Sequence, residues 1–170
     1  LQPDIDIRRI YSPEHGLHVH AEAGEAVPSK SGPIPVTSLY GGQKRPTKEE
    51  LSDIQLFVVD LPDIGARYYT YMATMKDCMA ACAESGTPML VLDRPNPLGG
   101  LLLEGPMPEV TGSPVCSAKI PVRHGMTLGE LAHFFANTEF KDRKLEVGVC
   151  AAGNWPRELM YPACALPWVP

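Results

Sequence analysis

Residues 56–61 of this chain, Leu56-Phe57-Val58-Val59-Asp60-Leu61, form a continuous apolar run that contains a single acid near its end. Such a run is typical of a strand inside a parallel sheet, where both faces are covered. Two further runs share the pattern, Met89-Leu90-Val91-Leu92-Asp93 and the segment 145–150. The three runs therefore predict three buried parallel strands.

Boundary signals predict helices between these strands. Thr47 with Glu50, and Thr127 with Glu130, have the spacing of capping boxes and predict two helix starts. Another helix is expected over residues 70–85. The alternation predicts an α/β fold with a doubly wound, mostly parallel sheet flanked by helices. Short strands are also expected at residues 5–11, 36–40, 101–103 and 119–122, and a long loop at 14–35.

The composition indicates a folded domain and excludes several functional classes. The 170 residues are 44% apolar and 21% charged, which suits one domain with a sizeable core. The net charge of −5 supplies no basic surface for nucleic acid. No apolar run approaches the ~20 residues of a membrane span. The five cysteines form no Cys-x-x-Cys pair, which favours packed thiols. The start, Leu1-Gln2-Pro3-Asp4, lacks the features of a signal peptide.

Acids follow the predicted strands at the edge where α/β proteins bind ligands. Glu14 stands at a corner between Pro13 and His15, a placement that suits general acid/base chemistry. The alternative is a loop glutamate that is exposed to water. Asp60 and Asp93 end strands, and each is either a site residue or a cap for the amides that follow.

Further candidates lie in the loops beyond the strands. Arg67 and Arg94 closely follow the strand-end acids, so ion pairs with those acids are plausible for both. Together with Arg123 they also suit bidentate binding of a substrate carboxylate. Asn96 stands between two prolines and is suited to a sugar hydroxyl or an acetamido group, or is simply a turn residue. Tyr69 belongs to a tyrosine cluster that fits either a sugar-stacking wall or the core. His124 precedes a helix start whose amides suit an anion, or is a hydrogen-bonded loop histidine.

A histidine cluster raises the alternative of a metal site. His15, His18 and His20 lie close together, with Glu14 or Glu22 beside them. Zinc ligands are usually fixed on regular elements or tight turns, whereas these residues lie in a long loop. No metal and no other cofactor is therefore expected. The chain also lacks a dinucleotide-binding glycine fingerprint, a Walker-type P-loop and a G-x-S-x-G nucleophile elbow.

Seven motifs follow one another along nearly the whole chain: Ser12-Pro13-Glu14-His15-Gly16, Ser38-Leu39-Tyr40-Gly41, Asp63-Ile64-Gly65-Ala66-Arg67-Tyr68-Tyr69-Thr70-Tyr71, Leu92-Asp93-Arg94-Pro95-Asn96-Pro97, Glu104-Gly105-Pro106, Ile120-Pro121-Val122-Arg123-His124-Gly125-Met126-Thr127 and Trp168-Val169-Pro170. In this order they resemble the bacterial NamZ-type exo-β-N-acetylmuramidase family, long known only as a domain of unknown function. One departure is Leu17-His18-Val19-His20, where the family commonly carries Phe-Arg-Gly.

The resemblance implies a glycosidase that releases terminal N-acetylmuramic acid from the non-reducing ends of peptidoglycan fragments. It implies that residues 1–170 form a Rossmann-like catalytic domain, followed by a smaller C-terminal domain, with the active site between them. Members usually begin with an earlier strand and helix and continue further, so the chain is expected to be incomplete. The expected partners are a muropeptide or disaccharide and that C-terminal domain. The expected location is secreted or periplasmic.

The resulting candidate site has two groups of residues. Glu14, as acid/base, is expected to act with His15 and Asp93. Substrate binding is expected from Asp63, Arg67, Tyr69, Arg94, Asn96, Arg123 and His124. As a general acid, Glu14 would need a pKa raised by burial or by a neighbouring acid such as Asp60 or Asp93. The second carboxylate is Asp93 or Asp63, or the substrate's acetamido group replaces it.

Two other functional classes stay open at this point. A non-catalytic muropeptide-binding module would have the same fold and release no sugar. A metal-dependent hydrolase using His15, His18 and His20 would lose its activity when a chelator is added.

Overall fold

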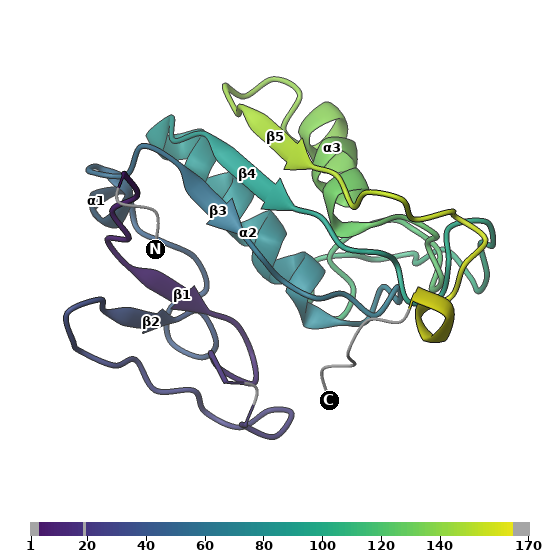
Figure 1. The fold of residues 1–170 in the computed structure, drawn as a ribbon, viewed down its shortest axis with the longest axis horizontal. Helices are drawn as coiled ribbons and strands as arrows, with labels where there is room; N and C mark the ends of the chain where they lie inside the picture. Colours follow the sequence, from purple (N-terminus) through teal and green to yellow (C-terminus); the bar gives the residue numbers. More distant parts are fainter. Residues whose placement is uncertain (1–3, 19, 165–170) are drawn as a thin grey trace.

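A computed structural model describes residues 4–18 and 20–164, in which parallel strands pack against helices (Figure 1). Strand β1 (Ile10–Ser12) pairs with β2 (Val36–Ser38), and β3 (Phe57–Val59), β4 (Met89–Leu92) and β5 (Val147–Cys150) form a second sheet in that order. Every one of these pairs is parallel. The predicted α/β class, with a parallel sheet flanked by helices, is confirmed. The motif Trp168-Val169-Pro170 lies outside the described residues.

Both predicted capping boxes form. In α1 (Lys48–Leu51) the hydroxyl of Thr47 accepts from the backbone of Glu50, whose carboxylate accepts from the backbone of Thr47. In α3 (Leu128–Thr138) Thr127 and Glu130 make the same reciprocal pair. Helix α2 (Thr70–Ser85) has the predicted bounds and ends at Gly86, which adopts a left-handed conformation. A short 3₁₀ helix, η1 (Tyr161–Cys164), follows near the end of the described chain.

The core lies between one face of the β3–β5 sheet and the two long helices, which Figure 1 shows side by side behind the strands. Its members come from both layers: Phe57, Val59, Met89 and Val91 from the strands, and Met72, Met75, Met79, Cys82, Leu131 and Phe135 from the helices. Burial of these side chains supplies the main favourable term in folding. The loops at the ends of the strands are thereby held in fixed relation.

The opposite face of this sheet is less buried than the sequence predicts. Val58 is 48% exposed and Leu56 is 46% exposed, although both belong to the apolar run. Strand β5 pairs only with β4, and Gly148 and Cys150 on it are exposed. The prediction of strands buried on both faces was therefore wrong, because α2 and α3 cover one face and β5 is an edge strand.

The region 101–122 contains none of the strands predicted there. Glu104 makes an isolated antiparallel bridge with Arg123, and Arg123 makes another with Ala66. Leu101 and Leu103 are both more than 60% exposed. Prolines along this segment remove backbone donors, and single bridges replace continuous ladders.

Two cysteines on α2 are part of the core. Cys78 and Cys82 are buried as free thiols, in agreement with the packed role predicted for them. Burial raises the pKa of the Cys82 thiol to about 12 and also raises that of the Cys78 thiol well above its ordinary value. Neither thiol carries an appreciable thiolate fraction at neutral pH. No helix among residues 4–18 and 20–164 has the length and apolarity needed to span a membrane.

Gly65 allows the loop before α2 to pack against Asn96. Its φ is 77°, and a Cβ placed there would overlap the side-chain oxygen of Asn96. That oxygen accepts from the backbone of Leu98, and the Asn96 amide donates to the carbonyl of Met126. A single buried asparagine thus joins three loops, and only glycine fits against it.

We predict that Gly65→Ala destabilises the fold well beyond the cost of its backbone conformation. Gly86→Ala is the matched control, because Gly86 has φ 76° and nothing within 4 Å of an added Cβ. The control should cost about 1 kcal/mol, and Gly65→Ala about 1–3 kcal/mol more from overlap with Asn96. Chemical denaturation of both variants measures this difference. Equal losses would show that the Asn96 contact has no energetic importance.

Candidate functional site

Glu14 lies at a sharp corner directly after β1. The backbone of Gly16 donates to the carbonyl of Pro13 (3.1 Å), and His15 and Gly16 both have positive φ, 70° and 77°. A left-handed conformation at a histidine costs on the order of 1 kcal/mol and tends to occur at functional sites. The Nδ1 atom of His15 is 2.8 Å from the carbonyl of Ala21, which holds the strained corner in place.

Three donors from separate parts of the chain surround the Glu14 carboxylate, and we call Gly24, Tyr40 and Thr70 the Glu14 cradle. The backbone of Gly24 donates to Oε1 (3.0 Å), the hydroxyl of Thr70 donates to Oε2 (2.7 Å), and the Tyr40 hydroxyl donates as well. Burial by itself raises the pKa of Glu14, but these hydrogen bonds and the nearby His15 outweigh it and lower the pKa below its ordinary value. Glu14 is therefore ionised near neutral pH, so the raised pKa expected of it was wrong.

Two tyrosines support the same corner. The Tyr71 hydroxyl donates to the backbone carbonyl of Glu14 (3.0 Å), and its ring lies 4.6 Å from that of Tyr69 and 6.4 Å from that of His15. Burial raises the pKa of both tyrosines, so both hydroxyls keep their protons. Tyr71 is core and Tyr69 is half-buried. The predicted cluster thus both packs and positions Glu14.

A cavity of about 410 Å³ shares its wall with the Glu14 cradle. All three cradle residues line it, together with Ala26, Leu39, Gly41, Lys44, Ala73, Thr74, Asp77 and Pro114. The volume lies within the range of roughly 300–1,000 Å³ that is usual for small-molecule sites. Glu14 itself does not line the cavity, so the cradle residues form the layer between its ionised carboxylate and a mainly apolar hollow.

Asp63 and His124 form a buried pair near Tyr69. The Asp63 carboxylate accepts from the backbone of Gly65, and its Oδ2 lies 3.7 Å from Nε2 of His124, while Oδ1 and that Nε2 are buried without partners. Burial raises the pKa of Asp63 to about 6 and lowers that of His124 to about 4. Since Nδ1 of His124 accepts from the backbone of Met126, its proton is on Nε2 and faces Asp63.

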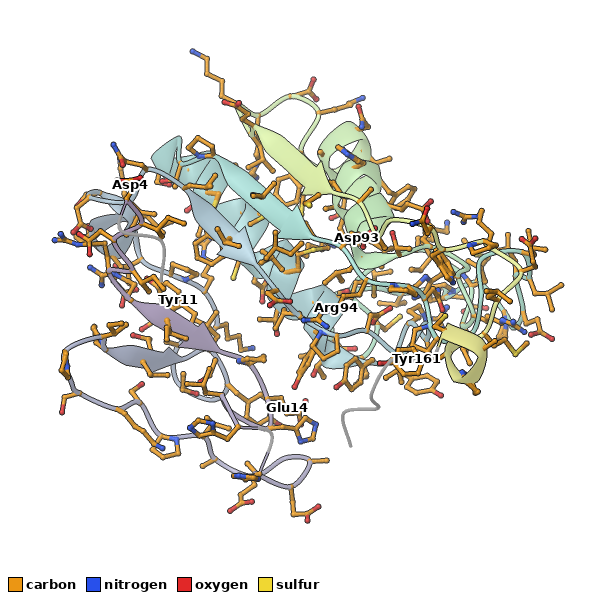
Figure 2. The ribbon with its side chains drawn as sticks, in the orientation of Figure 1. Asp4, Tyr11, Glu14, Asp93, Arg94 and Tyr161 are labelled. Atoms are coloured by element: carbon orange, nitrogen blue, oxygen red, sulfur yellow. The ribbon has the colours of Figure 1, made fainter. Side chains whose placement is uncertain are left out.

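Asp93 has the contacts of a cap. One of its oxygens accepts from the hydroxyl of Thr127 (2.7 Å) and the other from the backbone of Gly129 (2.8 Å), at the start of α3. Figure 2 shows Asp93 well separated from Glu14. The capping alternative is therefore the one these contacts favour, and no contact supports the predicted catalytic role. Asp60 is likewise no neighbour that could raise the pKa of Glu14, because it pairs with Arg94 at 2.6 Å in an exposed position.

Two of the arginines expected to bind a carboxylate hold loops instead. Arg67 donates to the carbonyls of Pro106 and Ile120 (3.0 and 2.6 Å). Arg123 pairs with Glu104 and donates to the carbonyl of Leu98. The side-chain amide of Asn96 makes the loop hydrogen bonds described above. The observed contacts of these residues are all with other parts of the protein. Their predicted contacts with a substrate stay predictions.

The three histidines of the metal alternative do not converge. The rings of His18 and His20 are 6.1 Å apart, and His15 turns to Ala21. Residues 4–18 and 20–164 contain no group of three His, Cys, Asp or Glu side chains that could hold a metal ion. The proposed ligand set is therefore not assembled.

Sequence reasoning missed the cradle and the cavity. Tyr40 lies within a quoted motif, and Thr70 is the first residue of α2, but nothing local indicates that their hydroxyls face Glu14. Gly24 and Lys44 stand in loops without a recognisable pattern. The available signals are that Tyr40 and Thr70 both belong to the motifs given above and to segments that follow strands.

The chain resembles characterised and structurally solved proteins over almost its whole length. A family model described as "Exo-beta-N-acetylmuramidase NamZ, N-terminal" matches residues 1–170. The peptidoglycan beta-N-acetylmuramidase NamZ of Bacillus subtilis (strain 168) is 43% identical over 172 residues, which cover 98% of this chain and 41% of that protein.

Two solved structures, both DUF1343 family proteins from Bacteroides fragilis NCTC 9343, share the fold. One has a TM-score of 0.86 and 38% identity and covers 99% of this chain and 43% of its own. The other has a TM-score of 0.72 and 35% identity and covers 90% of this chain and 41% of its own. The chain thus spans less than half the length of each of these relatives.

The Asp63–His124 pair yields a prediction about stability against pH. Between about pH 4 and pH 6 the folded pair holds its proton on Asp63, and the unfolded pair holds it on His124, so the two effects cancel. In His124→Gln only the raised Asp63 pKa is left, and the free energy of unfolding should fall as pH rises from 4 to 6. In Asp63→Asn only the lowered His124 pKa is left, and the free energy of unfolding should rise from pH 4 to 6.5.

Denaturant titrations of both variants across this range measure the two slopes. The expected change is on the order of 2 kcal/mol in each variant, in opposite directions. All other titrating groups are common to the two proteins, so the difference between their profiles isolates the pair. Parallel profiles would show that Asp63 and His124 titrate normally in the folded protein.

Proposed function

The chain belongs to the NamZ N-terminal family of exo-beta-N-acetylmuramidases, and from that premise we propose that it supplies the catalytic domain of a glycoside hydrolase. The proposed substrate is the terminal N-acetylmuramic acid at the non-reducing end of a peptidoglycan fragment. The observation that carries the proposal is the buried, ionised Glu14 carboxylate, whose three hydrogen-bond donors line a cavity of about 410 Å³.

Glu14 is proposed to act as the ionised carboxylate. An anion can activate a water molecule, attack the sugar carbon, or stabilise the positive charge that develops on the ring in the transition state. Donating a proton to the leaving oxygen would first require a proton that the cradle disfavours. The lowered pKa of Glu14 thus supports a base or nucleophile role in place of the acid role expected from the sequence.

Asp63 is the proposed second carboxyl group. Its pKa of about 6 keeps it largely protonated in mildly acidic solution, while Glu14 is ionised, and Tyr69 lies within electrostatic reach of both. Carboxyl groups whose pKa values are pushed apart are the usual arrangement for acid and base roles. Since Asp93 caps α3, Asp63 is the better supported of the two alternatives.

We predict that Glu14→Gln abolishes release of N-acetylmuramic acid from a chromogenic β-N-acetylmuramide. Loss of the charge should lower kcat by about 10²–10⁴-fold, while the amide retains the shape of the side chain. Glu22→Gln is the matched control, because Glu22 is an exposed acid in the loop that follows. The assay uses the protein with its natural flanking sequence. Wild-type turnover in Glu14→Gln would refute the assignment, and sugar binding without release by the wild type would indicate a binding module.

We also predict that Thr70→Val moves the acidic limb of the pH–rate profile to higher pH. Removing the 2.7 Å hydrogen bond from Thr70 destabilises the ionised form of Glu14 and so raises the pKa of Glu14. Activity is therefore lost at a higher pH when the solution is made more acidic. Thr74→Val is the control, since Thr74 donates to the carbonyl of Thr70 and lines the cavity without contacting Glu14. A limb that stays in place in Thr70→Val would show that Glu14 does not govern it.

A further inference from the structure

We propose that Lys44 binds the lactyl carboxylate of N-acetylmuramic acid in the cavity beside Glu14 and sets the preference for this sugar over N-acetylglucosamine. The inference rests on the proposed function and names the group that makes the substrate choice. The two sugars differ only by the lactyl ether, which carries one carboxylate. A cation placed to meet that carboxylate would distinguish the two sugars.

Four other basic side chains already make hydrogen bonds or ion pairs within the protein. Arg67 and Arg123 hold loop carbonyls, as described above. Arg45 pairs with Glu84 at 2.8 Å, and Lys76 pairs with Glu139 at 2.6 Å. Moving any of these toward a substrate would break a contact that already exists. A cation that has no such contact to give up is better placed to bind the lactyl carboxylate.

Lys44 meets this requirement. Among the described residues that line the cavity, Lys44 is the one cationic side chain. None of the ion pairs among residues 4–18 and 20–164 includes Lys44, and its charge acts on the Asp77 carboxylate from beyond ion-pair distance. The ammonium group has three donors on a flexible stem, which suits a carboxylate on a rotatable ether.

The surroundings of Lys44 fit the remainder of the substrate. Asp77 lies at the same end of the cavity, where burial raises its pKa and the charge of Lys44 opposes that rise. It therefore offers an acceptor for sugar hydroxyls. Leu39, Ala26 and Ala73 provide apolar surface for the acetyl and lactyl methyl groups. The cradle hydroxyls of Tyr40 and Thr70 line the same wall beside Glu14.

The test measures binding and turnover in Lys44→Met, in the conservative variant Lys44→Arg and in Lys48→Met. Lys48 is an exposed lysine that does not line the cavity, so its variant controls for net charge. Calorimetry gives the Kd of N-acetylmuramic acid, its lactyl methyl ester and N-acetylglucosamine, and kinetics with the chromogenic muramide separates KM from kcat. The protein again carries its natural flanking sequence.

Lys44→Met should weaken binding of N-acetylmuramic acid about tenfold. This loss is at the lower end of the range for a charge-assisted hydrogen bond, because Lys44 is exposed to solvent. In Lys44→Met the binding of the methyl ester and of N-acetylglucosamine should not change. The KM of this variant for the muramide should rise while its kcat is kept. Lys44→Arg should retain most of the affinity for N-acetylmuramic acid. Equal affinity of wild type and Lys44→Met for the acid would overturn the inference, as would parallel losses for all three ligands. A wild type that neither binds nor cleaves the muramide would refute the proposed function, and the inference with it.

Discussion

The buried charge of Glu14 is the constraint around which the rest of this structure is arranged. An ionised carboxylate that leaves water loses several kcal/mol of hydration unless hydrogen bonds replace it. Here the replacement comes from a loop glycine, a tyrosine beyond β2 and a threonine at the start of α2. Each donor belongs to a different segment, so the three donors surround Glu14 only when these segments have folded together. Loss of the carboxylate's partners would affect the corner, the loop and the helix together.

In the rest of the site, some polar residues hold loops in place and others line the cavity. Hydrogen bonds made by Asp93, Arg67, Arg123 and Asn96 fix the loops that follow the strands. The residues that line the ligand-sized cavity include the three donors to Glu14. Polar residues at the ends of parallel strands are therefore not all ligand-binding residues. Several of them only fix loops, while the strained corner at His15 is held by Ala21 and Tyr71.

The sequence predicted those parts of the molecule that depend on local pattern. The parallel strands, both capping boxes, the bounds of α2 and the corner at Glu14 follow from spacing within a few residues. The cradle was not predictable, since Thr70 is 56 residues from Glu14 and its hydroxyl has no local signature. The same limit explains Leu101–Leu103, where an apolar run suggested a strand but no neighbouring strand was available. It also explains Glu14 itself, whose pKa depends on partners that only the folded chain brings together.

The two thiols packed beneath the sheet have a practical consequence. Cys78 and Cys82 are closed to solvent, and burial holds them as neutral thiols, so an alkylating reagent can attack them only when α2 separates from the strands. Cys150, exposed on the edge strand, stays open to the same reagent. The molecule thus contains both a reporter of core opening and an internal reference for reagent strength. A single labelling time course can follow how the core opens without any engineered probe.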